Sequence, residues 1–434
     1  MLHSGILFKS RTGIFAIAAA IALAFLFCGT AAPAQAATPA KATVYASAQQ
    51  GNAFTVVPQK VTVRGNEAEK FGYTDGVKSA KGVTQLDVIV KMHELKYGKK
   101  FTKKTAGNYL QVSEGYITMA FGLTTYNWGI AENAQCAVDE NSQYQSWGYT
   151  GLSVSQATVA KNDSVTVFLY QDANAWSDNL TYFAQGGKFS VSATGYTGKK
   201  ISLSVKHLSN FMSNGTKNAK DRAAATSAVA NATLAKVGKN GKLKAIKGAT
   251  TNAKGVAKVS FKKPGTYLVS AKPVTGAYAT SPYVFVKVSA SKGYTVKKAG
   301  ATYTVSNAKK HYVTFKKAPK KATVKVPAKI KINGTSYKVT KIASKAFKGN
   351  KKITKVVIGK NVAKIGKKAF SHTPKLKTAV VGTKHLAKAK SVKGSFATSN
   401  LKHALTVKHT VAKKYVVKSF TKKNLKTPVA VKIA

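Results

Sequence analysis

The spacing of hydrophobic and polar residues predicts one helix followed by many short strands. Between Thr84 and Gly98 the apolar residues recur on one helical face, Thr84 and Asp87 stand where a capping box needs them, and Gly98 follows the end. Short aromatic and β-branched stretches then lie at 116–121, 148–154 and 164–170, separated by Gly, Asn and Asp. This pattern predicts an α+β domain over residues 61–187, with a linker before it at 37–60.

Residues 188–290 show only the two-residue period of strands. Ile201, Leu203 and Val205 alternate with polar residues, the same alternation recurs at 257–261, and a Lys-Pro-Gly turn at 263–265 leads into a further strand. The pattern predicts a small β-sandwich. The stretch 214–233 is rich in Ala, Asn and Thr without periodicity, which predicts a flexible insertion.

The last third of the chain contains an internal repeat. Residues 339–347 recur as 362–370, and a short strand-like stretch follows each copy, at 353–359 and 376–382. A period of 23 residues with one strand per unit predicts a short leucine-rich-repeat β-solenoid over residues 291–434, capped by 321–336, 396–407 and 415–431. The predicted repeat core is Ile342, Ala346, Phe347, Ile358, Ile365, Ala369, Phe370 and Leu376.

Three resemblances to known families follow from these residues. Residues 339–382, with their Ile-x-x-x-Ala-Phe units, resemble the BspA-like leucine-rich repeat of bacterial surface proteins, which implies a role in adhesion or host interaction. Residues 61–183 resemble the transcobalamin C-terminal-like domain through the helix at 84–97 and the strand at 162–170; in that family's vitamin carriers the fold contacts a corrinoid. Residues 255–271 are similar to bacterial Ig-like modules, which implies a spacer. The expected fold class is therefore multidomain.

The first 36 residues read as a secretory signal peptide. Lys9 and Arg11 precede an apolar run from Gly13 to Phe27, and Ala34-Gln35-Ala36 gives a small-x-small cleavage site. The run is too short for a transmembrane segment, and no other is predicted. Cleavage leaves Cys136 as the only cysteine, so no internal disulfide is expected. These features predict a protein that is secreted or located at the cell surface.

The charge is concentrated in the second half of the chain. The sequence has 71 Lys and Arg against 13 Asp and Glu, and every acidic residue lies at or before Asp221. Such a segment favours adhesion to an anionic cell-wall polymer or polysaccharide. The alternative is a solvated lysine surface set by compositional bias. Because nearly all basic residues are Lys, which cannot read base edges bidentately, sequence-specific nucleic-acid binding is not expected.

The sequence shows no pattern typical of catalysis or metal binding. It contains no Gly-x-Ser-x-Gly, His-Glu-x-x-His, paired-cysteine or phosphate-loop motif. Cys136 and His93 could be read as a catalytic cysteine–histidine pair, but a lone buried cysteine is the more common explanation. We therefore predict no cofactor, no metal and no enzyme activity. A secreted hydrolase would have to be built around acidic residues of the first half, namely Asp139, Glu140, Asp172 or Asp178.

One aromatic cluster suggests a ligand site. All three tryptophans fall in the first predicted domain, together with several tyrosines and amide side chains. If exposed, these rings would form a stacking platform for a sugar or another flat ligand, and if buried they would form the domain core. The candidate ligand-binding residues are Trp128, Trp147, Trp176, Tyr126 and Tyr149.

Two functions are consistent with this organisation. The first is a secreted bacterial surface protein for adhesion or binding, whose lysine-rich repeats attach to anionic wall polymers, with a host surface molecule as a further partner. Since no Leu-Pro-x-Thr-Gly-like sorting motif occurs, we expect electrostatic retention. The second is an extracellular binding protein for a small corrinoid-like or carbohydrate ligand, with the basic half as a passive anchor.

Overall fold

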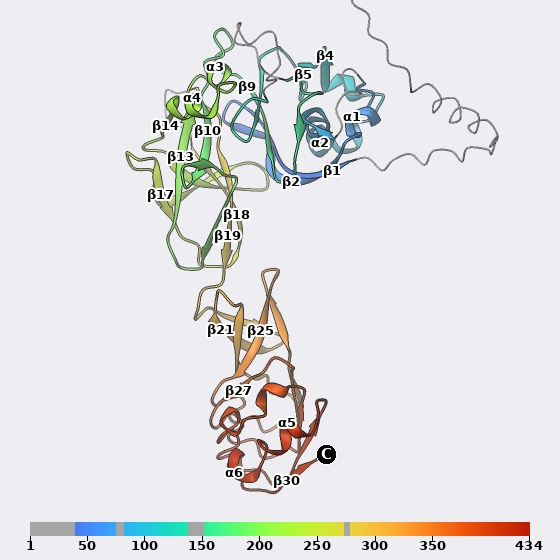
Figure 1. The fold of residues 1–434 in the computed structure, drawn as a ribbon, viewed down its shortest axis with the longest axis vertical. Helices are drawn as coiled ribbons and strands as arrows, with labels where there is room; N and C mark the ends of the chain where they lie inside the picture. Colours follow the sequence, from blue (N-terminus) through green and yellow to red (C-terminus); the bar gives the residue numbers. More distant parts are fainter. Residues whose placement is uncertain (1–39, 75–81, 138–151, 273–277) are drawn as a thin grey trace, which may run out of the picture.

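The computed structural model describes residues 40–74, 82–137, 152–272 and 278–434 (Figure 1). The described chain is mostly β-structure. The predicted signal peptide, Trp147, Tyr149 and most of the strand predicted at 148–154 lie outside the described residues. None of the helices in the described ranges has the length and apolar character needed to span a bilayer.

The first unit packs a helix on a four-stranded sheet. Helix α2 (Gln85–Tyr97) begins at Thr84 with the predicted capping box to Asp87 and ends at Gly98, so this prediction is confirmed. Its buried residues share one core with the sheet. The sheet has the order β2-β1-β9-β7, with β1 parallel to β9 and the other pairs antiparallel. Its strands are β1 (Lys41–Gln50), β2 (Ala53–Arg64), β7 (Trp128–Glu132) and β9 (Ser164–Leu169).

The predicted linker at 37–60 is wrong for most of its length. Residues from Lys41 onward form β1 and β2, and β1 is a central strand whose Ala42, Val44 and Ala46 are buried. The alternating positions of β1 carry mainly alanine, whose small side chain gives a weak hydrophobic signal in sequence yet fits against a close-packed helix. The domain therefore starts about twenty residues before the predicted boundary.

Smaller elements complete the first unit. Two strands, β3 and β8, pair beside the start of α2, and a three-stranded meander, β4-β5-β6, stands next to β7. The prediction at 116–121 corresponds to β5. These elements are α1 (Glu67–Lys70), β3 (Val83–Thr84), η2 (Gly98–Lys100), η3 (Ala106–Asn108), β4 (Leu110–Ser113), β5 (Tyr116–Ala120), β6 (Leu123–Thr124) and β8 (Thr158–Val159).

Two sheets that share one hydrophobic core form the second unit. The predicted alternation is realised, because Ile201, Leu203 and Val205 of β13 all point into this core. The unit begins with β10 rather than at residue 188, and its resemblance to Ig-like modules stays a prediction. One sheet contains β10 (Leu180–Gln185), β11 (Lys188–Phe189), β13 (Ile201–Leu208), β14 (Thr226–Ala228) and β17 (Val256–Val259); the other contains β12 (Ser192–Tyr196), β15 (Thr233–Val237), β16 (Leu243–Thr250), β18 (Gly265–Ala271) and β19 (Tyr283–Ser289).

The predicted flexible insertion at 214–233 is wrong. It contains α4 (Ala219–Ala224), which is capped by Asn218, and strand β14, which pairs with β13; α3 (Phe211–Asn214) precedes it. The Asn218 side chain accepts hydrogen bonds from the backbone N–H groups of Lys220 and Asp221. A local cap and one edge pairing thus order a segment that lacks hydrophobic periodicity.

The first two units are joined by hydrogen bonds around residues 278–283. The Gln49 carboxamide on β1 accepts from the Ser281 N–H at 2.7 Å and donates to its carbonyl at 3.3 Å. Gln171 donates to the Ala279 carbonyl at 3.2 Å. Both glutamines belong to the first unit and both acceptors to the second, so the two units are fixed against one another side by side, as Figure 1 shows.

The repeat half begins with a sheet that caps the stack. Its order is β20-β21-β22-β25-β24, and β27 pairs in parallel with β25. The predicted cap at 321–336 supplies β23 to the repeat sheet and β24 to this one. The strands are β20 (Thr295–Lys298), β21 (Ala301–Asn307), β22 (Tyr312–Lys317), β24 (Lys329–Ile332), β25 (Thr335–Ile342) and β27 (Lys364–Ile365).

An all-parallel sheet then runs through the repeats in the order β23-β26-β28-β29-β30. Inside the stack, the rings of Phe315, Phe347, Phe370 and Phe396 follow one another with centroids 5.4, 4.7 and 4.4 Å apart. All eight residues proposed as the repeat core lie in this core. The elements are β23 (Thr323–Val326), β26 (Lys355–Ile358), β28 (Thr378–Val381), η5 (Lys384–Leu386), η6 (Ala389–Ser391), β29 (Leu405–His409), α5 (Lys414–Val417), α6 (Lys422–Leu425) and β30 (Val431–Ile433).

Candidate functional site

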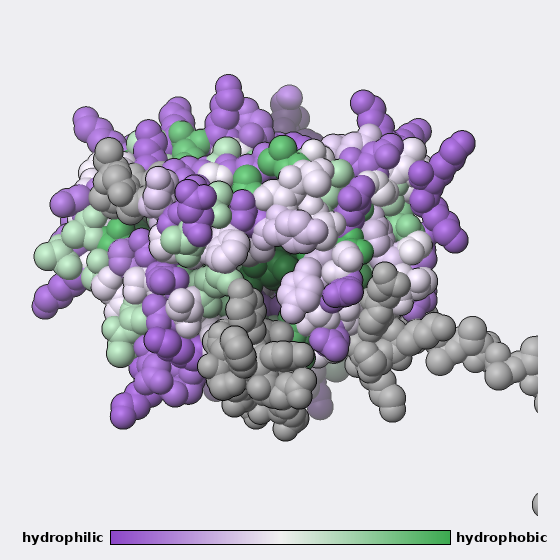
Figure 2. Space-filling model, turned by 90° about the horizontal axis from the view of Figure 1, so that it is seen from above, coloured by the Kyte–Doolittle hydropathy of each residue, from purple (hydrophilic) through white to green (hydrophobic). Residues whose placement is uncertain are grey.

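A cleft of about 610 Å³ lies at the end of the first unit that faces away from the repeats. Its walls come from the start of α2, the β4–β5 turn, β5, β7, the segment after β9 and helix α3. Figure 2 looks onto this end of the molecule and shows a hollow with hydrophobic side chains in its floor. A cavity of this size is in the range of small-ligand sites.

The cleft brings three of the predicted ligand residues together. Trp128, Trp176 and Tyr126 all line it, although they are far apart in sequence. Tyr126 is 79% exposed, Trp176 is half-buried, and Trp128 is only 8% exposed. The structure thus divides the aromatic cluster, because Trp128 belongs to the core whereas the Tyr126 ring is exposed. Trp147 and Tyr149 lie outside the described residues.

The tryptophans are held in different ways. Trp128 begins strand β7 and packs edge-on against Phe121, with ring centroids 6.0 Å apart. The indole N–H of Trp176 donates to the Asn127 side-chain oxygen at 2.7 Å, which fixes the ring over the cleft. Trp176 also has a φ of +48°, an unfavourable backbone conformation for a bulky residue. Strained residues of this kind cluster at functional sites.

Sequence reasoning missed several cleft residues. Tyr116, which is 61% exposed, stands at the start of β5 and is turned toward the cleft by a Glu114-Gly115 turn with two positive φ angles. Such a two-residue turn between paired strands is a hairpin signal that the sequence does carry. Met212 of α3 reaches the cleft from a position just before the stretch 214–233 that was predicted to be flexible. No local pattern could have placed it there.

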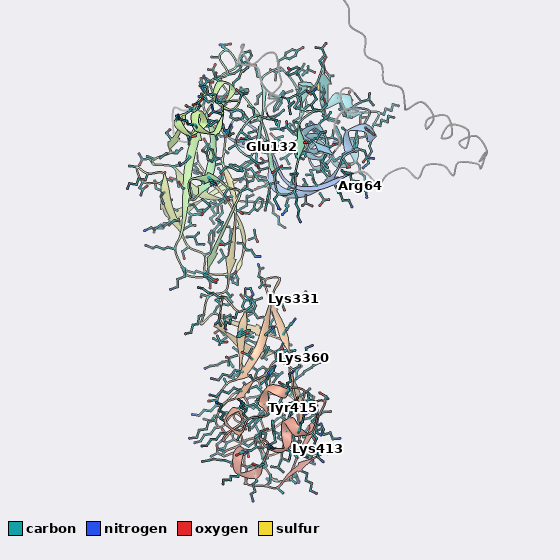
Figure 3. The ribbon with its side chains drawn as sticks, viewed as in Figure 1. Arg64, Glu132, Lys331, Lys360, Lys413 and Tyr415 are labelled. Atoms are coloured by element: carbon teal, nitrogen blue, oxygen red, sulfur yellow. The ribbon has the colours of Figure 1, made fainter. Side chains whose placement is uncertain are left out.

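A buried acid lies behind the cleft. The Gln85 side chain lines the wall and donates to a carboxylate oxygen of Glu132 at 2.9 Å. Burial raises the pKa of Glu132 to about 7. Glu132 is labelled in Figure 3, in the interior of the first unit. The neighbouring Asp163 carboxylate raises this pKa further, whereas the hydrogen bond from Gln85 lowers it and holds the Gln85 side chain in the wall.

The groups considered for catalysis have structural roles. Burial raises the pKa of the Cys136 thiol to about 12, which keeps it protonated at neutral pH. His93 does not face a thiol: its Nδ1 lies 2.8 Å from the Ile89 carbonyl and its Nε2 accepts from the Phe121 N–H. Asp178 is buried and accepts the Gln171 N–H. Asp172 accepts from the N–H groups of its own loop, and Asp139 and Glu140 lie outside the described residues.

Metal binding has no support in the described ranges. No group of three or more His, Cys, Asp or Glu side chains in these ranges is arranged to hold a metal ion. The three ion pairs found there all belong to one cluster of Glu67, Lys70, Lys91 and Glu94 in the first unit. Among the described residues, acidic side chains therefore form ion pairs with lysines only in the first unit.

The repeat half presents unneutralised lysines. Residues 291–434 carry 38 lysines and no acidic side chain. Exposed Lys341 and Lys364 are paired in register on β25 and β27, and Lys329 lies opposite Lys338 on β24 and β25. Figure 3 shows side chains projecting outward all along this half, with Lys331, Lys360 and Lys413 labelled. Like charges in register repel each other, so a bound anion would stabilise this surface.

The repeats also match a known family. The model of the BspA type leucine rich repeat region matches residues 327–431 in six copies. This stretch is therefore a BspA-type leucine-rich-repeat region, and it includes the degenerate copies predicted at 396–407 and 415–431 to cap the stack. The match covers about a quarter of the chain.

Two solved structures each align with about a third of the chain. A leucine-rich repeat protein from Bacteroides capillosus aligns at 20% identity over 32% of this chain and 98% of its own, with a TM-score of 0.20. A leucine rich cell surface protein from Faecalibacterium prausnitzii aligns at 16% identity over 33% of this chain and 44% of its own, with a TM-score of 0.21. No curated protein matches the chain.

Proposed function

We propose that the protein is a secreted bacterial surface protein that mediates adhesion or binding, and that its lysine-rich repeats attach it to anionic wall polymers or other polyanions. The observation that carries the proposal is the surface of residues 291–434, where 38 lysines meet no acidic side chain. The BspA-type repeats support a surface role, and the export signal read from the sequence agrees with it. The proposal includes no catalytic step.

The structure of the repeats offers a multivalent cationic face. Neighbouring strands of a sheet lie roughly 4.8 Å apart, so lysines in register on adjacent strands form closely spaced charges. Lys341 beside Lys364 and Lys329 beside Lys338 are two such pairs. A polymer with regularly spaced phosphates or sulfates can contact several of these charges at once. Counterion release then gives an affinity that falls steeply with salt.

A salt series on the chain without its first 36 residues tests this function. We compare a variant in which Lys329, Lys338, Lys341 and Lys364 become Gln with a matched variant in which four exposed lysines of the first unit become Gln, namely Lys99, Lys100, Lys103 and Lys104. Binding to isolated cell walls and to polyphosphate is measured from roughly 50 to 500 mM salt. We expect the repeat variant to show weaker binding and a smaller salt slope, by up to about 0.7–0.9 per lost phosphate contact. Equal behaviour of the two variants, or no binding at low salt, would rule out attachment through the repeats.

The cleft favours a second candidate function. A cavity of about 610 Å³ with exposed Tyr116 and Tyr126 suits an extracellular small-ligand-binding protein, in which the basic half is a passive anchor. Saturable binding of a small molecule that survives high salt would support this candidate. The Ig-like resemblance of the second unit fits a spacer between the cleft and the anchor.

A further inference from the structure

We propose that the cleft of the first unit binds an uncharged carbohydrate, with a sugar ring stacked on its exposed aromatic side chains. This inference rests on the second candidate function above and names its ligand class. It is independent of attachment through the lysine-rich repeats, because the cleft and the repeats lie at opposite ends of the molecule (Figure 1).

The first argument is the charge of the cleft wall. Although the chain has 71 Lys and Arg, none of the 21 residues that line the cleft is Lys, Arg or His. Among the described residues of the wall, the one acidic side chain is that of Glu114, which is exposed. The Cys136 thiol in the wall has a pKa raised to about 12 by burial. Because the described wall of the cleft has no cationic side chain although the chain is rich in lysine, the cleft does not favour an anionic ligand.

The second argument is the form of the aromatic surface. Tyr116 and Tyr126 are 61% and 79% exposed, and Trp176 is held by its hydrogen bond to Asn127. Large exposed rings lose little conformational entropy on binding and offer a flat apolar face with a polar edge. The C–H face of a sugar ring stacks on such a surface.

The third argument is the hydrogen-bonding capacity beside those rings. Gln85, Ser113, Thr118 and Ser153 place amide and hydroxyl groups in the wall, and these groups match sugar hydroxyls as both donors and acceptors. The indole N–H of Trp128 is buried and has no acceptor among the described residues. Because this nitrogen is inaccessible from the cleft, the hydrogen bonds to a sugar would come from the amide and hydroxyl groups of the wall.

A corrinoid fits these features less well than a sugar. A corrin is a broad ring that carries a cationic cobalt centre and many amide side chains. The wall of the cleft instead presents small hydroxyl groups and separate aromatic rings. No histidine in the wall is available as a ligand to a metal centre. A neutral glycan uses the same wall without any such group.

The test measures binding by the chain without its first 36 residues in 500 mM salt, which suppresses attachment through the lysines. The probes are cellotetraose, maltotetraose and chitotriose as neutral glycans, trigalacturonate as an acidic glycan, and cyanocobalamin. Calorimetry gives the affinities, and tryptophan fluorescence reports the cleft, because all three tryptophans lie in the first half of the chain. We expect at least one neutral glycan to bind, with an affinity that does not change between 50 and 500 mM salt.

Variants separate the cleft from the rest of the surface. Tyr126→Ala and Tyr116→Ala remove exposed rings of the cleft, so neither is expected to disturb folding, whereas Tyr278→Ala removes a ring that is 56% exposed and lies outside it. Loss of one stacking ring should weaken binding about tenfold. Trp176→Phe keeps one aromatic ring but loses part of the indole face as well as the hydrogen bond to Asn127, so it should also weaken binding.

The inference is overturned if no neutral glycan binds, if only trigalacturonate or cyanocobalamin binds, or if Tyr278→Ala weakens binding as much as the cleft variants. These results leave the attachment of the repeats untouched, since that function is measured at low salt with the lysine variants. Conversely, if the chain binds a neutral glycan but fails to bind cell walls, glycan binding by the cleft is supported and attachment through the lysine-rich repeats is refuted.

Discussion

The stacked phenylalanines of the repeat half give the sharpest prediction about stability. Phe370 is fully buried, and its ring lies between those of Phe347, 4.7 Å away, and Phe396, 4.4 Å away. Truncating a buried Phe to Ala typically costs about 3–5 kcal/mol. Because Phe370→Ala also removes two ring contacts, each contributing about 0.5–1.5 kcal/mol, we expect the upper end of that range.

This cost should be visible as a large fall in melting temperature. For a unit of this size, 1 kcal/mol shifts the midpoint by about 2–4 °C, so Phe370→Ala should lower it by about 10–20 °C. Phe420→Ala removes a buried ring that has no ring contact within the described part of the chain, and should cost less. The control is Tyr415→Ala, which removes a half-buried ring labelled in Figure 3 and should shift the melting temperature little.

The chain allows the two halves to be followed separately. All tryptophans lie at or before Trp176, so tryptophan fluorescence reports unfolding of the first half, whereas far-ultraviolet circular dichroism reports both halves. We expect Phe370→Ala to lower the melting temperature of the repeat half alone, which circular dichroism detects and tryptophan fluorescence does not. If Phe370→Ala shifts the melting temperature no more than Tyr415→Ala, the stack does not stabilise the repeats as argued. A parallel shift of the fluorescence transition would show that the halves unfold as one unit.

Three further predictions concern single residues. Burial lowers the pKa of His93 to about 4, so the first unit should lose up to about 3 kcal/mol of stability as pH falls from 6.5 toward 4. His93→Gln should reduce this loss. Stability is measured by urea titration in a Glu132→Gln background, because the Glu132 pKa, raised to about 7, has the opposite effect on stability over this pH range. Gly366→Ala would place a methyl group 2.3 Å from the Ser344 backbone nitrogen of the preceding repeat, so it should destabilise the repeats by more than about 1 kcal/mol. The control is Gly107→Ala, whose methyl group would meet no atom within 4 Å and should leave the melting temperature unchanged. Thr84→Ala removes the cap of α2 and should cost about 1 kcal/mol in the fluorescence transition, and an unchanged midpoint would contradict the capping role.

The sequence predicted those elements whose signals are local. Helix α2 is marked by its capping box and terminal glycine, and β13 by strict alternation of large apolar residues. Strand β1 escaped notice because its inward positions carry small alanines, and burial of these depends on the helix that packs on them. Local pattern cannot contain that information.

The repeats illustrate the same limit. Two units 23 residues apart were recognisable, but the next ones place Phe396 and Phe420 at spacings of 26 and 24 residues and so break the period. A signal was present nevertheless: a serine precedes each of these two phenylalanines, and all four residues are buried. In the cleft, Tyr126 and Trp176 could be proposed from sequence as aromatic residues, yet only the fold shows that they line one wall with Tyr116.

The distribution of acidic residues argues that the charge of the repeat half is a local property and not a bias of the whole chain. In the first unit, turns and caps use carboxylates: Asp87 caps α2, and Asp163 accepts the Ala160 N–H. In the repeats, neutral groups make the equivalent bonds, as where Asn350 accepts the N–H groups of Lys352 and Ile353, and Thr421 that of Asn424. Aspartate serves both kinds of position equally well. A bias acting on the whole chain would have replaced the carboxylates of the first unit as well, so the lack of carboxylates after Asp221 is a local property of the sequence.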